Sequence, residues 1–339
     1  MHDFRGLLLA LATLVLWSLS PFFFTHTGRK VGPFSTNLLR LALAFIFLLA
    51  LAALRIAFGA HSPLPHSLTH SLLHSLPHPA AWFWLAASGV LGLAIGDAFL
   101  YEAFVTVGPE RTSQIQTLAP AATAAVAWLV LKEYLTIGQS AGMALILAGV
   151  FLATTSAARR KTALLAAEGR AEGVSLPVEA TGKVAPSSKV RNPLWTGTMA
   201  AIWSALFQGL GTVLARQAFL GQADLDPITA TTIRIGAGAV VLWVYARMQG
   251  PLGPTLGGWT DRKVLRLLLA GTAFGPVMGM ICYVSALKYA PAGIVTTVTF
   301  MAPLLIIPIG AKLYGTRITT GAVCGTALSL AGVVLLGLG

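Results

Sequence analysis

Four charged side chains lie inside long apolar stretches of this chain, where their residue types could support chemistry. They are Arg40, Asp97, Glu102 and Arg234. A charge at the centre of a membrane costs roughly 2.5–3.5 kcal/mol on insertion scales, so such groups usually pair or face water. A carboxyl group removed from water takes up a proton more readily, which coupling to a proton gradient requires. Asp97 is therefore a candidate proton-coupling group, and an Asp97–Arg40 ion pair is the alternative.

The neighbours of these charges suggest further roles. Tyr101 follows Asp97 by four residues, so both lie on one helical face and could form a hydrogen bond. Glu102 lies nearer to the end of the same segment and is a second candidate for coupling or gating. Arg40 and Arg234 follow a proline at the same distance, which favours a structural or gating role near a membrane face, where a long side chain can reach water.

Two other apolar stretches carry polar side chains beside a proline. One helical face would hold Ser113, Gln116, Thr117 and Pro120, and another Thr296, Thr299, Phe300 and Pro303. A proline inside a helix frees the carbonyl four residues earlier, which a membrane tolerates where a neighbour or a water-filled cavity satisfies it. We expect helix kinks at Pro120 and Pro303. The polar faces either pack against neighbouring helices or bind substrate in a cavity.

Aromatic and histidine side chains complete the candidates. Trp17, Trp203 and Tyr283 could form aromatic walls of a cavity, or the tryptophans could anchor helices at the membrane interface. Histidines recur every four or five residues in a loop, at His61, His66, His70, His74 and His78. Such spacing could gather zinc ligands on a helix, but the surrounding prolines favour a low-complexity loop. We therefore expect neither a metal site nor a cofactor.

These residues must be positioned by membrane-spanning helices. The chain is 56% hydrophobic and only 10% charged, whereas soluble domains are about a quarter charged. A spanning helix needs about 20 apolar residues. The predicted spans are Gly6–Phe24, Pro33–Leu54, Ala81–Val107, Thr112–Leu131, Ile137–Ala158, Pro193–Ala215, Pro227–Ala246, Leu267–Leu287, Ala292–Ala311 and Ile318–Gly339. The fold class is thus an all-α polytopic membrane protein with ten transmembrane helices.

The chain also contains an internal duplication. An offset of 183 residues pairs Gly92 with Gly275 and Ala119-Pro120 with Ala302-Pro303. We predict a first five-helix repeat at 1–158, a polar and disordered linker at 159–192, and a second five-helix repeat at 193–339. Because five is odd, the second repeat must enter the membrane from the opposite side. Inverted repeats of this kind are typical of alternating-access transporters.

The motifs of each half resemble an EamA-type domain of the drug/metabolite transporter superfamily. The resemblance rests on Trp17-Ser18, Arg40, the two Ala-Pro pairs, Lys132-Glu133-Tyr134, and the glycines that precede Ala148-Gly149-Val150 and Ala331-Gly332-Val333. It implies ten helices around a central cavity and export or exchange of small metabolites. The second half departs from the pattern, since Gly315-Thr316-Arg317 replaces Lys132-Glu133-Tyr134.

The sequence therefore predicts a secondary transporter in the plasma membrane, driven by protons or another gradient, with amino acids or drugs among its possible cargoes. A membrane-embedded enzyme and a channel are the alternatives. The expected partners are a small-molecule substrate and lipid, without nucleic acid, and the chain is expected to be a monomer or a weak homodimer. The chain has a net charge of +12, and 16 of its 23 basic residues lie on the side of the linker. The positive-inside rule then places the termini outside, whereas the resemblance implies cytoplasmic termini.

Overall fold

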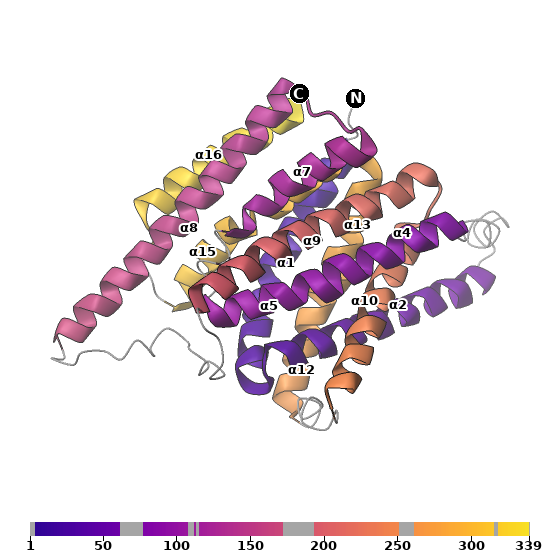
Figure 1. The fold of residues 1–339 in the computed structure, drawn as a ribbon, viewed down its shortest axis with the longest axis horizontal. Helices are drawn as coiled ribbons and strands as arrows, with labels where there is room; N and C mark the ends of the chain where they lie inside the picture. Colours follow the sequence, from indigo (N-terminus) through magenta and orange to yellow (C-terminus); the bar gives the residue numbers. More distant parts are fainter. Residues whose placement is uncertain are drawn as a thin grey trace.

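A computed structural model gives the fold and describes residues 4–61, 77–107, 112, 115–171, 193–250, 261–314 and 318–338. Within these ranges the regular structure is helical and no strand occurs (Figure 1). The first half contains α1 (Phe4–Val31), α2 (Pro33–His61), α4 (Pro79–Gly89), the π-helical segment η1 (Val90–Gly96), α5 (Asp97–Thr106), α7 (Leu118–Leu131) and α8 (Ile137–Ala171). The second half contains α9 (Pro193–Gly221), α10 (Pro227–Gln249), α12 (Arg262–Thr272), the π-helical segment η4 (Ala273–Gly279), α13 (Met280–Tyr289), α14 (Ala292–Thr299), α15 (Ala302–Tyr314) and α16 (Thr320–Leu338).

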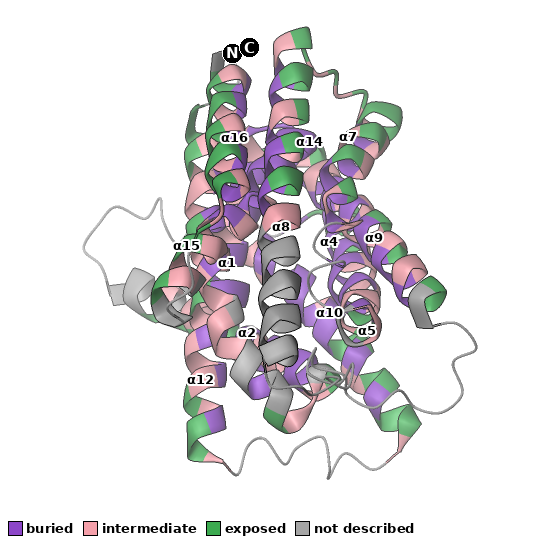
Figure 2. Ribbon diagram, turned by 90° about the vertical axis from the view of Figure 1, so that its left-hand side faces the viewer, coloured by how far each residue is buried: buried purple, intermediate pink, exposed green. Residues whose placement is uncertain are grey.

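The lengths and compositions of these helices suit a membrane. Nine helical stretches of the described chain are long and apolar enough to cross one, and α7 is a shorter apolar helix. Large apolar side chains such as Phe83, Leu129 and Val334 are more than half exposed on the outside of the bundle, as lipid contact requires. The exposed residues cover the outer faces of the helices, while the buried ones face inward (Figure 2). The prediction of an all-helical polytopic membrane protein is confirmed. The inversion of the repeats stays a prediction.

The element boundaries repeat as well as the sequence. An offset of 183 residues carries α4, η1 and α5 onto α12, η4 and α13, with matching first and last residues. The first helix of each half packs mainly against helices of the opposite half. Helix α1 contacts α12, η4, α13 and α14, and α9 contacts α4, η1, α5 and α7. The two halves are thus interleaved, and a site between them draws side chains from both.

Close helix contacts depend on glycine where backbones meet. A Cβ on Gly211 of α9 would lie 2.9 Å from the Cα of Gly92 in η1. Helices α8 and α16 meet in the same way, since a Cβ on Gly142 would lie 2.7 Å from the Gly332 carbonyl oxygen. In lipid, such close packing replaces the hydrophobic effect as the force that associates helices.

The two prolines predicted to kink helices instead begin new ones. Helix α7 starts at Leu118, which places Pro120 in its first turn, and α15 starts at Ala302, directly before Pro303. The first backbone N–H groups of a helix have no partner within it, so proline loses no hydrogen bond there. The predicted spans Thr112–Leu131 and Ala292–Ala311 are therefore interrupted helices.

The first part of the predicted linker is helical and not disordered. Helix α8 continues to Ala171, so the beginning of the predicted 159–192 linker is helical. This stretch contains Ala-Leu-Leu-Ala-Ala, residues of high helix propensity, which extend the apolar helix before them. Residues 172–192 lie outside the described part of the chain.

Candidate functional site

A cavity of about 310 Å³ lies between the two halves. Its volume is at the small end of the range for small-molecule sites. The polar and aromatic residues on its wall are Trp17, Ser20, Arg40, Asp97, Gln116, Thr117, Gln208, Thr212, Arg234, Tyr283, Thr296, Thr299 and Phe300. The breaks before α7 and α15 lie at this wall, since Thr117 and Pro303 also line the cavity.

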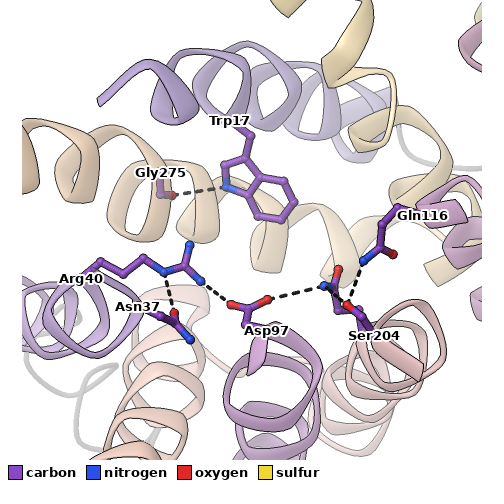
Figure 3. A network of polar contacts seen from close by, with 8 residues as sticks. Trp17, Asn37, Arg40, Asp97, Gln116, Ser204 and Gly275 are labelled. Atoms are coloured by element: carbon purple, nitrogen blue, oxygen red, sulfur yellow. Dashed lines mark hydrogen bonds and ion pairs between the residues drawn. The ribbon is translucent and has the colours of Figure 1, made fainter. Parts of the chain in front are cut away.

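Arg40 and Asp97 form an ion pair in the cavity (Figure 3). Arg40 comes from α2, and Asp97 is the first residue of α5, directly after η1. Their side chains are 17% and 10% exposed. Arg40 Nε also donates to Asn37 Oδ1 over 2.8 Å, and its guanidinium lies 5.6 Å from the ring centre of Tyr101. Asp97 thus has the ion-pair partner that the sequence suggested, and both members of the pair line the cavity.

A chain of amides and a hydroxyl extends from Asp97 across the cavity wall (Figure 3). Gln208 Nε2 lies 3.5 Å from Asp97 Oδ1 and donates to Ser204 Oγ over 3.0 Å. Ser204 Oγ also accepts from Gln116 Nε2 over 2.8 Å. The carboxylate is therefore connected to Arg40 of α2, to α9 and, through Ser204, to Gln116 in the segment before α7.

Arg234 lies on the opposite half of the wall and is almost fully buried, with 3% of its surface exposed. Its guanidinium carbon lies 5.6 Å from the ring centre of Tyr283, and Nη1 is 3.7 Å from Met280 Sδ. Tyr283 in turn shares a hydrogen bond of 2.6 Å with Thr212 and lies 5.1 Å from Trp17, ring centre to ring centre. Trp17 Nε1 donates to the Gly275 carbonyl over 3.3 Å. The structure places Arg234 in the interior and not near the end of its helix.

Most of the residues singled out in the sequence meet at this cavity. Those on its wall are Trp17, Arg40, Asp97, Gln116, Thr117, Arg234, Tyr283, Thr296, Thr299 and Pro303. Thr296 and Thr299 donate to carbonyls of their own helix, at 2.7 and 3.0 Å. Their hydroxyl oxygens remain available as acceptors.

Other candidates lie elsewhere. Trp203 is 50% exposed and packs beside Phe207, because the neighbouring Ser204 occupies the inward side of α9. Glu102 is exposed, and its carboxylate accepts from Thr106 over 3.2 Å. Tyr101 contacts Arg40 without lining the cavity, and Pro120 does not line it either.

Two groups of predicted residues fall beyond what the structure describes. Ser113 and the histidine run from His66 to His74 lie outside the described residues. His78 lies just before α4, where Nδ1 is 3.5 Å from the Ala80 backbone nitrogen. Among the described residues, no group of three or more histidine, cysteine, aspartate or glutamate side chains could hold a metal ion.

Three polar residues of α9 were not predicted for the site. Ser204, Gln208 and Thr212 recur every four residues and form one polar stripe along α9. This spacing marks a single helical face, so the periodicity of the segment contains the signal that would have found them.

Comparison with known proteins agrees with this architecture. The model of the EamA-like transporter family matches residues 4–155 and 195–338. No curated protein matches the chain. Among solved structures, one titled "Crystal structure of protein" aligns with a TM-score of 0.66 over 98% of this chain and 96% of its own. The two sequences are 17% identical, so this similarity concerns the fold alone.

Proposed function

Because the chain belongs to the EamA-like transporter family, we propose that it is a secondary transporter that moves a small metabolite across the plasma membrane by alternating access. The Arg40–Asp97 pair in a cavity between two repeated halves carries this proposal. Substrate sites between repeats, near the middle of the membrane, are typical of secondary transporters. The volume of the cavity suits a small molecule and not a macromolecule.

Ion pairs near the ends of the helices supply contacts that a transport cycle would break and remake. Arg216 Nε donates to Glu133 Oε1 over 2.7 Å, and Glu133 Oε2 accepts from the Ala292 backbone over 3.0 Å. Lys30 pairs with Asp261 between α1 and α12. Each contact joins helices that are distant in the sequence, so relative movement of the halves must strain or break it.

Asp97 supplies the proposed coupling step. A proton that adds to the Asp97 carboxylate removes its negative charge and weakens its hold on Arg40. Arg40 then keeps its hydrogen bond to Asn37 but loses its anionic partner. An unpaired buried charge is costly, so protonation of Asp97 favours a different arrangement of the helices around the cavity. In this proposal, proton binding and substrate binding influence each other through this pair.

Transport by purified protein in liposomes tests the proposal. A mixture of radiolabelled amino acids, sugars, nucleosides and organic acids would be offered with and without a pH gradient. We expect uptake of at least one compound, faster with the gradient and accompanied by exchange of labelled for unlabelled substrate. A channel would pass solute without such exchange, and chemical conversion without uptake would indicate an enzyme. Either result would overturn the proposal.

A further inference from the structure

The two cavity arginines occupy equivalent places in the two halves, but only one has a carboxylate partner. Arg40 and Arg234 each follow the first proline of their helix by seven residues. Each guanidinium lies 5.6 Å from the ring centre of a tyrosine. The two arginines differ in the charge of the side chain that each one contacts.

Met280 occupies the position that corresponds to Asp97. The offset of 183 residues pairs these two, and the structure places both at the first position after a π-helical segment, in α5 and α13. Arg40 Nη2 contacts the Asp97 carboxylate, whereas Arg234 Nη1 contacts the Met280 sulfur at 3.7 Å. The thioether is a weak acceptor with no charge, so it does not neutralise the arginine.

Arg234 is therefore a buried cation that forms no ion pair with any described carboxylate. Asp97 attracts it from a distance, but that carboxylate is paired with Arg40. Its Nε has no hydrogen-bond acceptor in the described part of the protein. Of the three charged side chains on the cavity wall, Arg40 and Asp97 neutralise each other, which leaves one positive charge. Burying a charge without a partner is expensive, and a ligand that brings an anion would offset this cost.

We propose that Arg234 binds the carboxylate of the transported compound, which takes the place that a second acidic residue would have filled. This inference rests on the proposed transport function and names its substrate class: a small organic carboxylate. One unpaired arginine matches the single charge of a carboxylate, whereas a phosphate monoester carries between one and two charges near neutral pH. A planar guanidinium also suits a planar carboxylate through two parallel hydrogen bonds.

The rest of the wall indicates the remainder of the ligand. Trp17, Tyr283 and Phe300 provide aromatic surface for an apolar body. Gln116 donates its amide to Ser204, while its Oε1 lacks a donor in the described residues. A hydroxyl or amino group on the ligand would satisfy this buried acceptor.

Equilibrium binding to the full-length protein in detergent tests the inference without requiring transport. The probes are labelled acetate, benzoate and indole-3-acetate, each compared with its uncharged amide, together with phenyl phosphate. We expect saturable binding of at least one carboxylate and no measurable binding of its amide. The Arg234→Gln variant lacks the buried guanidinium, so it should bind the carboxylate roughly 30-fold or more weakly. Binding of amides as well as acids, preference for phenyl phosphate, or no saturable binding of any carboxylate would overturn the inference.

A second variant supplies the missing acid from within the protein. In Met280→Asp, the new carboxylate should pair with Arg234 and abolish binding of the carboxylate probe. Asparagine has the shape of aspartate without its charge, so Met280→Asn should bind the probe more tightly than Met280→Asp. Met248→Asp is the matched control, because Met248 is 80% exposed near the end of α10 and far along the helix from Arg234. Equal binding by the Met280→Asp and Met280→Asn variants would contradict the inference.

The two proposals fail in different ways. A protein that binds carboxylates in detergent but moves nothing across liposomes would refute the transport function. One that transports an uncharged compound and binds no carboxylate would refute the role of Arg234 and leave the transport function standing.

Discussion

Replacement of Glu133 by alanine should destabilise the folded protein more than any exposed carboxylate replacement. Glu133 follows α7, and its two oxygens accept from the Arg216 guanidinium and from the Ala292 backbone at the start of α14. The Arg216 and Glu133 side chains are 13% and 12% exposed. Removal of one partner from a buried ion pair costs roughly 3–5 kcal/mol.

The structure places the expected cost at the lower end of this range. After the replacement, Arg216 Nη1 still donates to the carbonyls of Leu287 and Lys288, at 2.6 and 3.1 Å. Its charge loses its partner, but its hydrogen bonds are partly kept. We therefore expect the free energy of unfolding to fall by about 3 kcal/mol. Since 1 kcal/mol shifts the Tm of a chain of this size by about 2 °C, the Tm should fall by roughly 6 °C.

Thermal unfolding of the detergent-purified protein measures this change. Glu102→Ala is the matched control, because Glu102 is exposed and its carboxylate has only Thr106 as a side-chain hydrogen-bond partner among the described residues. Exposed interactions of this kind contribute at most about 1 kcal/mol. If Glu133→Ala and Glu102→Ala lowered the Tm by the same amount, Glu133 would not hold the segment after α7 against α9 and α14.

Three further predictions concern packing, pH and the cavity wall. A Cβ on Gly325 of α16 would lie 2.8 Å from the Ala153 backbone nitrogen of α8, so Gly325→Ala should lower stability by roughly 1–3 kcal/mol through overpacking. Gly337→Ala, whose new Cβ would meet its nearest atom at 3.6 Å, should leave the Tm unchanged. Equal melting of both variants would refute the close contact of Gly325 with α8. A hydrogen bond from Lys30 and backbone hydrogen bonds from Val264 and Lys263 lower the pKa of Asp261 from 3.8 to about 2. The stabilisation is therefore present above pH 3.8 and is lost as the pH falls through about 2. Asp261→Asn should remove this part of the pH dependence of the Tm, and an unchanged profile would contradict these contacts. Gln116→Ala should change the rate of transport while the protein still reaches the membrane, and a normal rate would exclude Gln116 from the substrate path.

Periodicity and composition predicted much of this molecule. The apolar segments, the duplication with its fixed offset and the Arg40–Asp97 pair as one of two alternatives all follow from the sequence. Each depends on physics that acts locally or repeats along the chain: the apolar length needed to span a membrane, the recurrence of motifs, and the cost of a lone buried charge.

What could not be predicted depends on which way a residue faces within the assembled bundle. Trp203 repeats the position of Trp17 in the sequence, yet it lies outside the cavity because Ser204 takes the inward side of α9. Helix breaks near Pro120 and Pro303 were expected as kinks, since a proline alone does not reveal whether the preceding helix has already ended. These outcomes are set by tertiary packing and not by local preference.

Proton-driven transport by the Asp97→Asn variant tests the central claim most directly. Asparagine keeps the size of the side chain and can still accept a hydrogen bond from Arg40, but it cannot bind and release a proton near neutral pH. In liposomes, we expect the variant to lose accumulation of substrate driven by a pH gradient and to keep exchange of labelled for unlabelled substrate. Asp224→Asn, in an exposed turn between α9 and α10, is the control and should keep both activities. Accumulation by Asp97→Asn equal to that of the unaltered protein would contradict the claim that this carboxylate couples transport to the proton gradient.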